Sequence, residues 1–419
     1  MLDAKIETQP EQATARAEML IIAYHFLSLR ESGAARPARF AKFLRRGGMR
    51  VHVVTQGDAV RLENHPDTRC TIGSAASRSV CIASRLAHHI QRRLLPYNEC
   101  LPWVPYAVAT ASQILRTNPV RFILSTSPPL ATHVAALELK RRFGMHWIAD
   151  FRDPLSDNPF RNRRWARPYD RAVEYSLFRF ADVIIANTDS VAELWRRRYP
   201  QWTHKIQLIW NGYDPEDHLE AAPIPPRPFR VLTHVGSLYG GRRPTLLLDS
   251  LWRLVRSGRL DPSGFRLRLI GPREANASGI HDSAFAALLG LGCLECHGES
   301  VPVEQARLAM TEADWLLLLD LNESGAALQV PAKLFEYICI GRPILAFTLP
   351  DSPVERILMR SGVPHRCVHP PDSAKHIDDT VSEFLRLPSN PIAPAEWFCR
   401  HFDSRGQVAM LRDLLESRI

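Results

Sequence analysis

Apolar residues occur in short continuous runs along most of this chain, and segments with helical spacing separate the runs. Such a run is typical of a strand that is buried on both faces of a parallel sheet. In the first half of the chain the runs are residues 19–24, 51–55, 121–125, 147–150, 181–186 and 206–209. Helical spacing is found in residues 35–46 and 130–143. The alternation predicts βαβ units, and therefore a doubly wound parallel sheet.

The same alternation begins again after residue 229. The predicted strands of this second half are residues 230–235, 266–270, 294–297, 315–319 and 343–347. The predicted helices are residues 244–257, 282–289, 303–311 and 331–340. The fold class that follows is α/β, with two Rossmann-like doubly wound domains that face a cleft.

A proline-rich segment, residues 221–228, separates the two halves and reads as a semi-rigid linker. We therefore predict an N-terminal domain over residues 19–220 and a C-terminal domain over residues 229–390. The tail, residues 391–419, contains a helical pattern from 395 to 417. We expect this helix to return to the first domain and pack on it.

Composition places the chain among ordinary globular proteins. It has 419 residues, of which 45% are apolar and 23% charged, enough for two domains. No apolar run approaches the roughly 18 to 20 residues that span a bilayer. The polar, acidic start of the chain lacks the pattern of a signal peptide, and the eight cysteines follow no disulfide framework. A cytoplasmic location is expected. Cys293 to His297 match a haem-attachment spacing, but they fall on a predicted strand.

The formal charge of +9 favours an anionic partner: phosphate groups, an acidic membrane surface or nucleic acid. No nucleic-acid recognition motif is visible, which disfavours the last of these. Residues 82–94 have the pattern of a basic amphipathic helix, and basic residues surround Trp165. Such segments either rest on anionic lipid, at the inner face of the plasma membrane, or pack against the domain core. Both alternatives stay open at this point.

The strongest candidate for chemistry is the segment 329–347, which reads as loop, helix, turn and strand. Pro331 suits a first helical position, and Gly341 suits the residue after a helix end. Lys333 and Glu336 share one face near the helix N-terminus. That end favours a phosphate, Lys333 can neutralise it, and Glu336 can accept hydrogen bonds from sugar hydroxyls. The alternative is an ordinary solvated Lys/Glu pair.

A glycine-rich loop follows the first predicted strand of the second half. Its candidate phosphate-binding residues are Gly236, Ser237, Gly241, Arg242 and Arg243. Backbone N–H groups in such a loop can cradle phosphates, with the two arginines as counter-charges. The loop is neither a Walker A motif nor a dinucleotide-binding fingerprint.

Two loops of the first half lie where parallel sheets bind ligands, at the carboxyl ends of strands. The first contains Gly33 and is followed by Arg36 and Arg39, which can meet an anion or form a solvated helix face. The second is Asp150-Phe-Arg152-Asp153, a candidate for polar chemistry. The alternative for Asp150 is a structural pair with Arg152.

With these residues in place, the chain resembles the GT-B glycosyltransferases of family 4, which are retaining enzymes that use nucleotide sugars. The resemblance covers nearly the whole chain and depends on several motifs in order. They are Glu31-Ser-Gly, Trp147 to Pro154, Ala181 to Thr188, Ile209 to Asp214, His234 to Gly241 and Val330 to Tyr337, which contains Lys-Leu-Phe-Glu-Tyr.

The resemblance implies that the first domain holds the acceptor and the second the donor. Glu336 would bind the donor ribose, and Lys333 with the Arg242 region would hold the diphosphate. Asp150 or Asp153 would face the acceptor and, with Lys333 and Arg242, would be the catalytic residues. Gly33, Arg36 and Arg152 would lie on the acceptor side. One departure concerns the family's two glutamates, which are separated by seven intervening residues, because the position of the first, eight before Glu336, is Leu328 here. The usual carboxylate contact to the donor sugar is therefore missing.

The resulting hypothesis is a retaining glycosyltransferase that moves a sugar to a glycan or lipid-linked acceptor in surface polysaccharide or glycolipid biosynthesis. Lys333, Arg242 and the helix N-terminus would stabilise the leaving diphosphate, so no metal or other cofactor is expected. Two alternatives use the same fold. One is a nucleotide-sugar 2-epimerase, which needs no acceptor, and the other is a non-catalytic protein that binds a nucleotide sugar or a partner enzyme.

Overall fold

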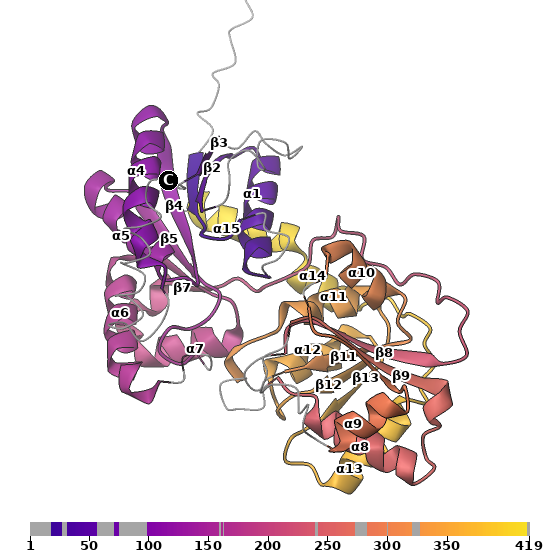
Figure 1. The fold of residues 1–419 in the computed structure, drawn as a ribbon. Coiled ribbons are helices and arrows are strands. Elements are labelled where there is room, and N and C mark those ends of the chain that lie inside the picture. Colours follow the sequence, from indigo (N-terminus) through magenta and orange to yellow (C-terminus); the bar gives the residue numbers. More distant parts are fainter. Residues whose placement is uncertain are drawn as a thin grey trace, which may run out of the picture.

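The fold contains two parallel sheets, each covered by helices on both faces (Figure 1). We describe it from a computed structural model, which defines residues 18–26, 32–56, 71–74, 99–158, 161, 163–238, 242–272, 283–299, 301–320 and 327–416. The predicted helix over residues 82–94 and Gly241 lie outside these residues. No helix in the described ranges is long and apolar enough to cross a membrane.

The first sheet is made of β1 (Glu18–Ile22), β2 (Arg50–Thr55), β3 (Thr71–Ser74), β4 (Val120–Ser127), β5 (His146–Phe151), β6 (Val183–Ala186) and β7 (Ile206–Leu208). Its strand order is β3-β2-β1-β4-β5-β6-β7, and every pair is parallel. Its helices are α1 (Ala35–Arg46), α4 (Val104–Thr117), α5 (Ala131–Phe143), α6 (Arg167–Phe180) and α7 (Asp189–Arg198).

The second sheet is made of β8 (Arg230–Val235), β9 (Phe265–Ile270), β10 (Leu294–His297), β11 (Trp315–Leu319), β12 (Ile344–Phe347) and β13 (His365–Val368). Its order, β10-β9-β8-β11-β12-β13, repeats that of the first sheet except that β7 has no counterpart. The helices around it are α8 (Thr245–Arg256), α9 (Ser283–Gly290), α10 (Val303–Thr311), α11 (Ala332–Ile340), α12 (Pro353–Ser361), α13 (Ala374–Phe384) and α14 (Glu396–Phe402). The strand order reverses between β8 and β11, which is where such sheets bind ligands.

Alternate residues of the strands supply separate cores on the two faces. In β1, Leu20 and Ile22 pack with α4 to α7, whereas Met19 and Ile21 pack with α1. In the second sheet one core joins α8, α9 and α13, and another joins α10, α11, α12 and α14. These fully buried strands explain the continuous apolar runs of the sequence.

The last helix, α15 (Ser404–Glu416), leaves the second domain and packs beside α1 of the first (Figure 1). Val408, Leu411 and Leu415 complete the core that contains Met19 and Ile21. The return to the first domain is therefore confirmed, but the tail is two helices rather than one. The break falls at Asp403, where the chain forms a parallel bridge with Tyr213.

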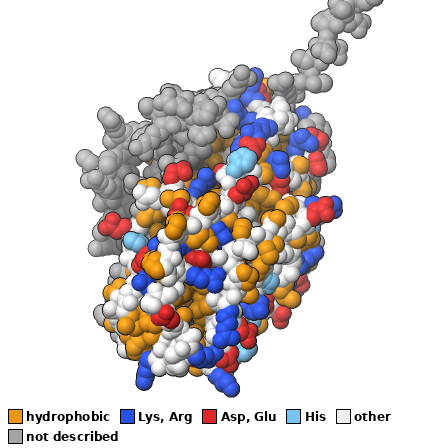
Figure 2. All heavy atoms as spheres, turned by 90° about the vertical axis from the view of Figure 1, so that its right-hand side faces the viewer, with side chains coloured by type: hydrophobic (Ala, Val, Ile, Leu, Met, Phe, Trp, Pro, Cys, Tyr) orange, Lys and Arg blue, Asp and Glu red, His pale blue; other side chains and the backbone are white. Residues whose placement is uncertain are grey.

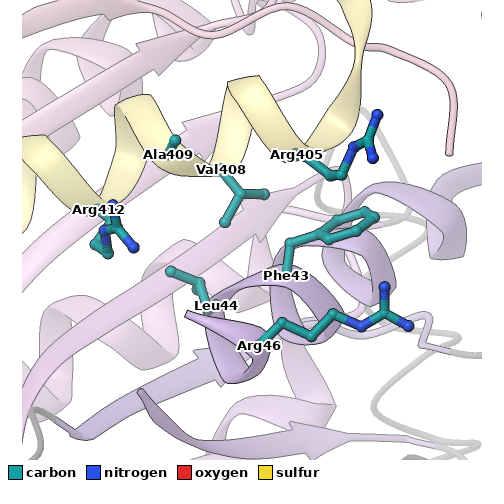
Figure 3. Close-up of a pocket in the computed structure, with 7 residues that line it drawn as sticks. All are labelled: Phe43, Leu44, Arg46, Arg405, Val408, Ala409 and Arg412. Carbon is teal, nitrogen blue, oxygen red and sulfur yellow. The ribbon is translucent and has the colours of Figure 1, made fainter. Parts of the chain in front are cut away.

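A groove of about 200 Å³ remains between α1 and α15 (Figure 3). Phe43, Leu44, Val408 and Ala409 line it, together with Arg46, Arg405 and Arg412. Each of these arginines forms an ion pair with an acidic residue, respectively Glu216, Asp403 and Glu416. The groove therefore presents no excess of positive charge.

Candidate functional site

Helix α11 starts where the sequence predicts and presents its N-terminus beside the end of β8. Pro331 is the N-cap residue, and Gly341 ends the helix with a positive φ of 77°. A Cβ at residue 341 would lie 2.4 Å from the carbonyl oxygen of Ile392, so only glycine fits there. The buried Tyr337 hydroxyl accepts a hydrogen bond of 3.0 Å from the backbone N–H of Val235. This bond fixes α11 relative to the glycine loop.

Lys333 and Glu336 lie on one face of α11, as predicted. Lys333 Nζ is 2.8 Å from Glu336 Oε2, and about a third of each side chain is exposed. The two side chains therefore form the ordinary i,i+3 Lys/Glu ion pair that was the alternative to a ligand-binding role. A partly exposed ion pair of this kind contributes little to stability. A phosphate or a sugar hydroxyl can therefore replace either partner with a small loss of free energy. The pair is compatible with a donor-binding role.

The glycine loop after β8 has the tight backbone that the sequence indicates. Gly236 has a φ of 155°, and its carbonyl oxygen would lie 2.3 Å from a Cβ at Gly271. Ser237 and Arg242 are partly buried, and Arg243 is exposed. The charge of Arg242 reaches both the buried ring of His234 and the carboxylate of Asp153. Arg242 therefore lies at the boundary of the two domains.

Asp153 of the first domain lies next to the second domain. Gln329 Nε2 donates a hydrogen bond of 2.8 Å to Asp153 Oδ1. Burial raises the pKa of Asp153, and the charges of Arg152 and Arg242 oppose that rise. The structure thus brings Asp153 and Arg242, two of the predicted catalytic residues, into one electrostatic environment.

Asp150 does not reach that environment. Its side chain is fully buried at the end of β5, with Arg36 Nη2 at 2.8 Å from Oδ1 and Thr126 Oγ1 at 2.8 Å from Oδ2. Arg36 also donates to the carbonyl oxygens of Ile209 and Trp210. The expected contact of Arg36 with a ligand anion, and the alternative pairing of Asp150 with Arg152, are thus replaced by a buried Arg36–Asp150 pair.

Arg152 and Gly33 lie against each other. The Arg152 guanidinium donates to the carbonyl oxygens of Gly33 and Pro128, and Nε donates to that of Ser127 over 3.2 Å. A Cβ at Gly33 would occupy the place of Arg152 Nη1, so the glycine makes room for the guanidinium. The predicted acceptor residues Gly33 and Arg152 therefore hold two loops together, and their contact with an acceptor stays a prediction.

Sequence reasoning assigned no role to His234, the penultimate residue of β8. Its ring is 5% exposed, and Nδ1 is 3.0 Å from the carbonyl oxygen of Leu317 on β11. Burial lowers the pKa of His234 to about 4, with smaller contributions from the positive charges of Arg242 and Lys333. A histidine at the end of a strand, two residues before a glycine loop, was the available signal.

Leu328, which occupies the position of the family's first glutamate, contacts the first domain. Its side chain packs against the first-domain core, and its carbonyl oxygen accepts a hydrogen bond of 3.1 Å from Thr188 Oγ1. Arg356 and Asp189 form a second interdomain contact at 3.1 Å. The segment before α11 thus joins the domains. Among the described residues, no three His, Cys, Asp or Glu side chains gather in a metal-binding cluster.

Comparison with known proteins bears on the fold and on the first domain. Residues 36–217 match the family model of Glycosyltransferase Family 4. A search of curated protein sequences gives no match. Among solved structures, sucrose-phosphate synthase from Thermosynechococcus elongatus aligns with a TM-score of 0.66 and 14% identity, over 96% of this chain and 99% of that one.

Two further structures align over nearly their whole length. HepE from Anabaena, solved with UDP, has a TM-score of 0.61 and 15% identity over 96% of this chain and 100% of its own. WaaG, a glycosyltransferase involved in lipopolysaccharide biosynthesis, has a TM-score of 0.56 and 14% identity over 94% and 95%. The chain has the GT-B fold, and its residues 36–217 match the Glycosyltransferase Family 4 model.

Proposed function

We propose that the protein is a glycosyltransferase that transfers a sugar, with retention of anomeric configuration, from a nucleotide-sugar donor to a glycan or lipid-linked acceptor. The observation that carries the proposal is the position of Lys333 and Glu336 in the first turns of α11, beside the loop that leads to Arg242. HepE has been solved with UDP and with UDP-glucose, which supports a nucleotide-sugar donor. WaaG supports a role in surface glycan biosynthesis.

The residues of the second domain would act on the leaving group. As the glycosidic bond of the donor breaks, negative charge develops on the diphosphate. Lys333, Arg242 and the free N–H groups at the start of α11 would stabilise that charge more in the transition state than in the bound donor. Glu336 would accept hydrogen bonds from the ribose, and Pro331, Gly236, Ser237 and Arg243 would line the diphosphate. These groups supply the positive charge without a metal ion.

Thermal unfolding with UDP, GDP, ADP and their sugar conjugates tests the donor site. A ligand that binds only the native state stabilises it by about 2.7 kcal/mol at a hundredfold excess over Kd. One nucleotide family should raise the melting temperature of the wild type, and Glu336→Ala should abolish that rise. Glu193→Ala is the matched control, because Glu193 forms an exposed ion pair on α7 of the first domain. No response of the wild type to any nucleotide would contradict the proposal.

Leu328 favours one alternative function. A leucine has no carboxylate to offer a donor sugar, and the side chain of Leu328 packs on the first domain instead. A non-catalytic protein that binds a nucleotide sugar or a partner enzyme is therefore the second candidate. Release of nucleoside diphosphate with lipid-linked acceptor extract separates the two, since a non-catalytic protein releases none. A 2-epimerase would instead convert the nucleotide sugar in the absence of any acceptor.

We further propose that the first domain contacts an anionic membrane surface at the inner face of the plasma membrane, which carries lipid-linked acceptors. Trp165 is 68% exposed, and the exposed side chains of Arg163, Arg167 and Arg171 surround it in the sequence. The acids of this segment, Asp170 and Glu174, are buried and pair with Arg161 and Arg198 rather than with these three arginines. Elsewhere, on the face shown in Figure 2, basic and acidic side chains are mixed.

Flotation with anionic liposomes tests this contact. The wild type should float at low salt and sink at high salt, because screening weakens attraction between exposed charges. Arg167→Glu combined with Arg171→Glu should prevent flotation, and the same change at Arg253 and Arg256 of α8 serves as the control. Absence of wild-type binding at low salt would contradict the proposal.

A further inference from the structure

His234 has a buried nitrogen that makes no hydrogen bond in the described part of the protein. Its Nδ1 lies 3.0 Å from the carbonyl oxygen of Leu317. A carbonyl oxygen can only accept, so Nδ1 carries the ring proton. The other nitrogen, Nε2, then has a lone pair, and it is buried without a partner. The protein has fixed the tautomer, and Nε2 can only be an acceptor.

The surroundings of the ring keep this nitrogen unprotonated. Burial, assisted by the positive charges of Arg242 and Lys333, lowers the pKa of His234 to about 4. At neutral pH the ring is therefore uncharged. A buried acceptor without a partner costs about 1 to 3 kcal/mol, so a native protein usually supplies one from solvent or a ligand.

The chemistry of the site determines which part of a donor suits Nε2. A diphosphate offers only acceptor oxygens at neutral pH and cannot hydrogen-bond to an unprotonated nitrogen. A hydroxyl can donate, and both the ribose and the transferred sugar carry hydroxyls. Residue 236 is glycine and places no side chain beside the ring. A Cβ at this position would lie 3.4 Å from Nε2.

We propose that His234 Nε2 accepts a hydrogen bond from a hydroxyl of the nucleotide sugar and so contributes to donor specificity. The inference extends the donor site proposed above and depends on it. It also addresses Leu328, which leaves the site without the family's first carboxylate acceptor. The site in this chain therefore combines cations for the diphosphate with a neutral acceptor for a hydroxyl.

Two amide variants separate the two nitrogens of the ring. His234→Asn retains a donor near the position of Nδ1, which faces Leu317, and removes the acceptor at Nε2. His234→Gln reaches the position of Nε2 with an amide oxygen. We would measure Kd by calorimetry for UDP-glucose and UDP at pH 7.5, or for the equivalent pair if the nucleotide panel identifies another base.

His234→Asn should weaken UDP-glucose binding about tenfold or more, and His234→Gln should remain within about threefold of the wild type. A loss confined to UDP-glucose assigns the hydroxyl to the transferred sugar, and an equal loss with UDP assigns it to the ribose. Without ligand, the melting temperature of His234→Asn should agree with that of the wild type within about 3 °C, because Nε2 has no partner to lose among the described residues. His234→Gln gives up the hydrogen bond to Leu317 and should melt at a lower temperature.

Three results would overturn the inference. Unchanged affinity of His234→Asn would show that only water occupies the position. Equal weakening of both variants, together with a lower melting temperature of His234→Asn without ligand, would show a purely structural role. Failure of the wild type to bind any nucleotide sugar would remove the proposed donor site as well, whereas the first two results leave that site intact.

Discussion

The two sheets share one strand order, apart from the extra strand β7 of the first, but use the charged residues at their ligand-binding edges differently. In the first domain, Asp150 is fully buried against Arg36, and Arg152 is bonded to backbone carbonyls. In the second domain, Lys333 and Glu336 are each about a third exposed, and Arg243 is exposed. The first domain uses its charges to hold its own loops, while the second leaves them within reach of a ligand.

This difference shows that a charged residue after a strand can have either a structural or a ligand-binding role. A buried pair such as Arg36–Asp150 loses much of its attraction to desolvation and has no free group to offer a substrate. An exposed pair is weak and can be exchanged for a ligand. Burial, rather than position along the strand, distinguishes the two domains, and the following substitutions test that distinction.

The largest effect is expected in the first domain. Arg36→Ala leaves the Asp150 carboxylate buried without its counter-ion, which should lower the free energy of unfolding by about 3 to 5 kcal/mol. Urea titration followed by circular dichroism measures the change. Arg46→Ala on the same helix is the control, because its side chain is about half exposed, and we expect a loss below about 1 kcal/mol. Equal losses in the free energy of unfolding for the two variants would show that breaking the buried pair costs no more than removing an exposed arginine.

In the second domain, Lys333→Ala should lower the rate of sugar transfer about a hundredfold while unfolding changes by less than about 1 kcal/mol. The reason is that the Lys333–Glu336 pair is partly exposed, whereas the developing charge of the diphosphate would need the cation. Initial rates with the donor found by the nucleotide panel measure the effect, and Arg197→Ala is a matched exposed control. Undiminished transfer would argue against the role of Lys333.

The pH dependence of stability should identify His234 as a buried neutral group. Its pKa of about 4 in the folded protein lies below the ordinary value of 6.5, so the unfolded chain binds more protons between these values. Stability therefore falls as the pH drops through this window. Between pH 7.5 and pH 5, the free energy of unfolding of the wild type should fall by about 2 kcal/mol more than that of His234→Asn. The same change at the exposed His376 should alter nothing, and a pH-independent difference would contradict the assignment.

The smallest effect is expected at the exposed contact between the domains. Arg356 and Asp189 are each nearly half exposed, so a double-mutant cycle should give a coupling energy of about 0.2 to 1 kcal/mol that decreases with salt. Unfolding titrations of Arg356→Ala, Asp189→Asn and the double variant measure it. A coupling above about 2 kcal/mol would mean that this pair, rather than packing around Leu328, holds the domains together.

Sequence patterns predicted the central strands well because these are buried on both faces. The run at β11, Trp315–Leu319, is entirely apolar and could hardly be read otherwise. The edge strand β13, His365–Val368, was missed because only Val368 is fully buried and no apolar run marks it. The tail was predicted as one helix because no glycine or proline marks the break at Asp403. That break depends on a bridge to Tyr213, which is distant in the sequence.

The site shows the same limit. Lys333 and Glu336 could be placed together because helical spacing is local. The Arg36–Asp150 pair joins residues 114 positions apart, and the bond between His234 and Leu317 joins residues 83 apart. Spacing carries no information about such contacts. Sequence reasoning therefore found the exposed groups of the second domain and misjudged the buried groups of the first.

The return of α15 to the first domain has a consequence for the order of events during synthesis. The core around Met19 and Ile21 includes Val408, Leu411 and Leu415, so the first sheet to leave the ribosome needs the last helix to cover one of its faces. At about 5 to 20 residues per second, that helix arrives on the order of 10 to 40 seconds after β7, the last strand of that sheet. During this interval the nascent first domain exposes an apolar face, which makes it a natural client for chaperones and the part of the chain that is most sensitive to a premature stop.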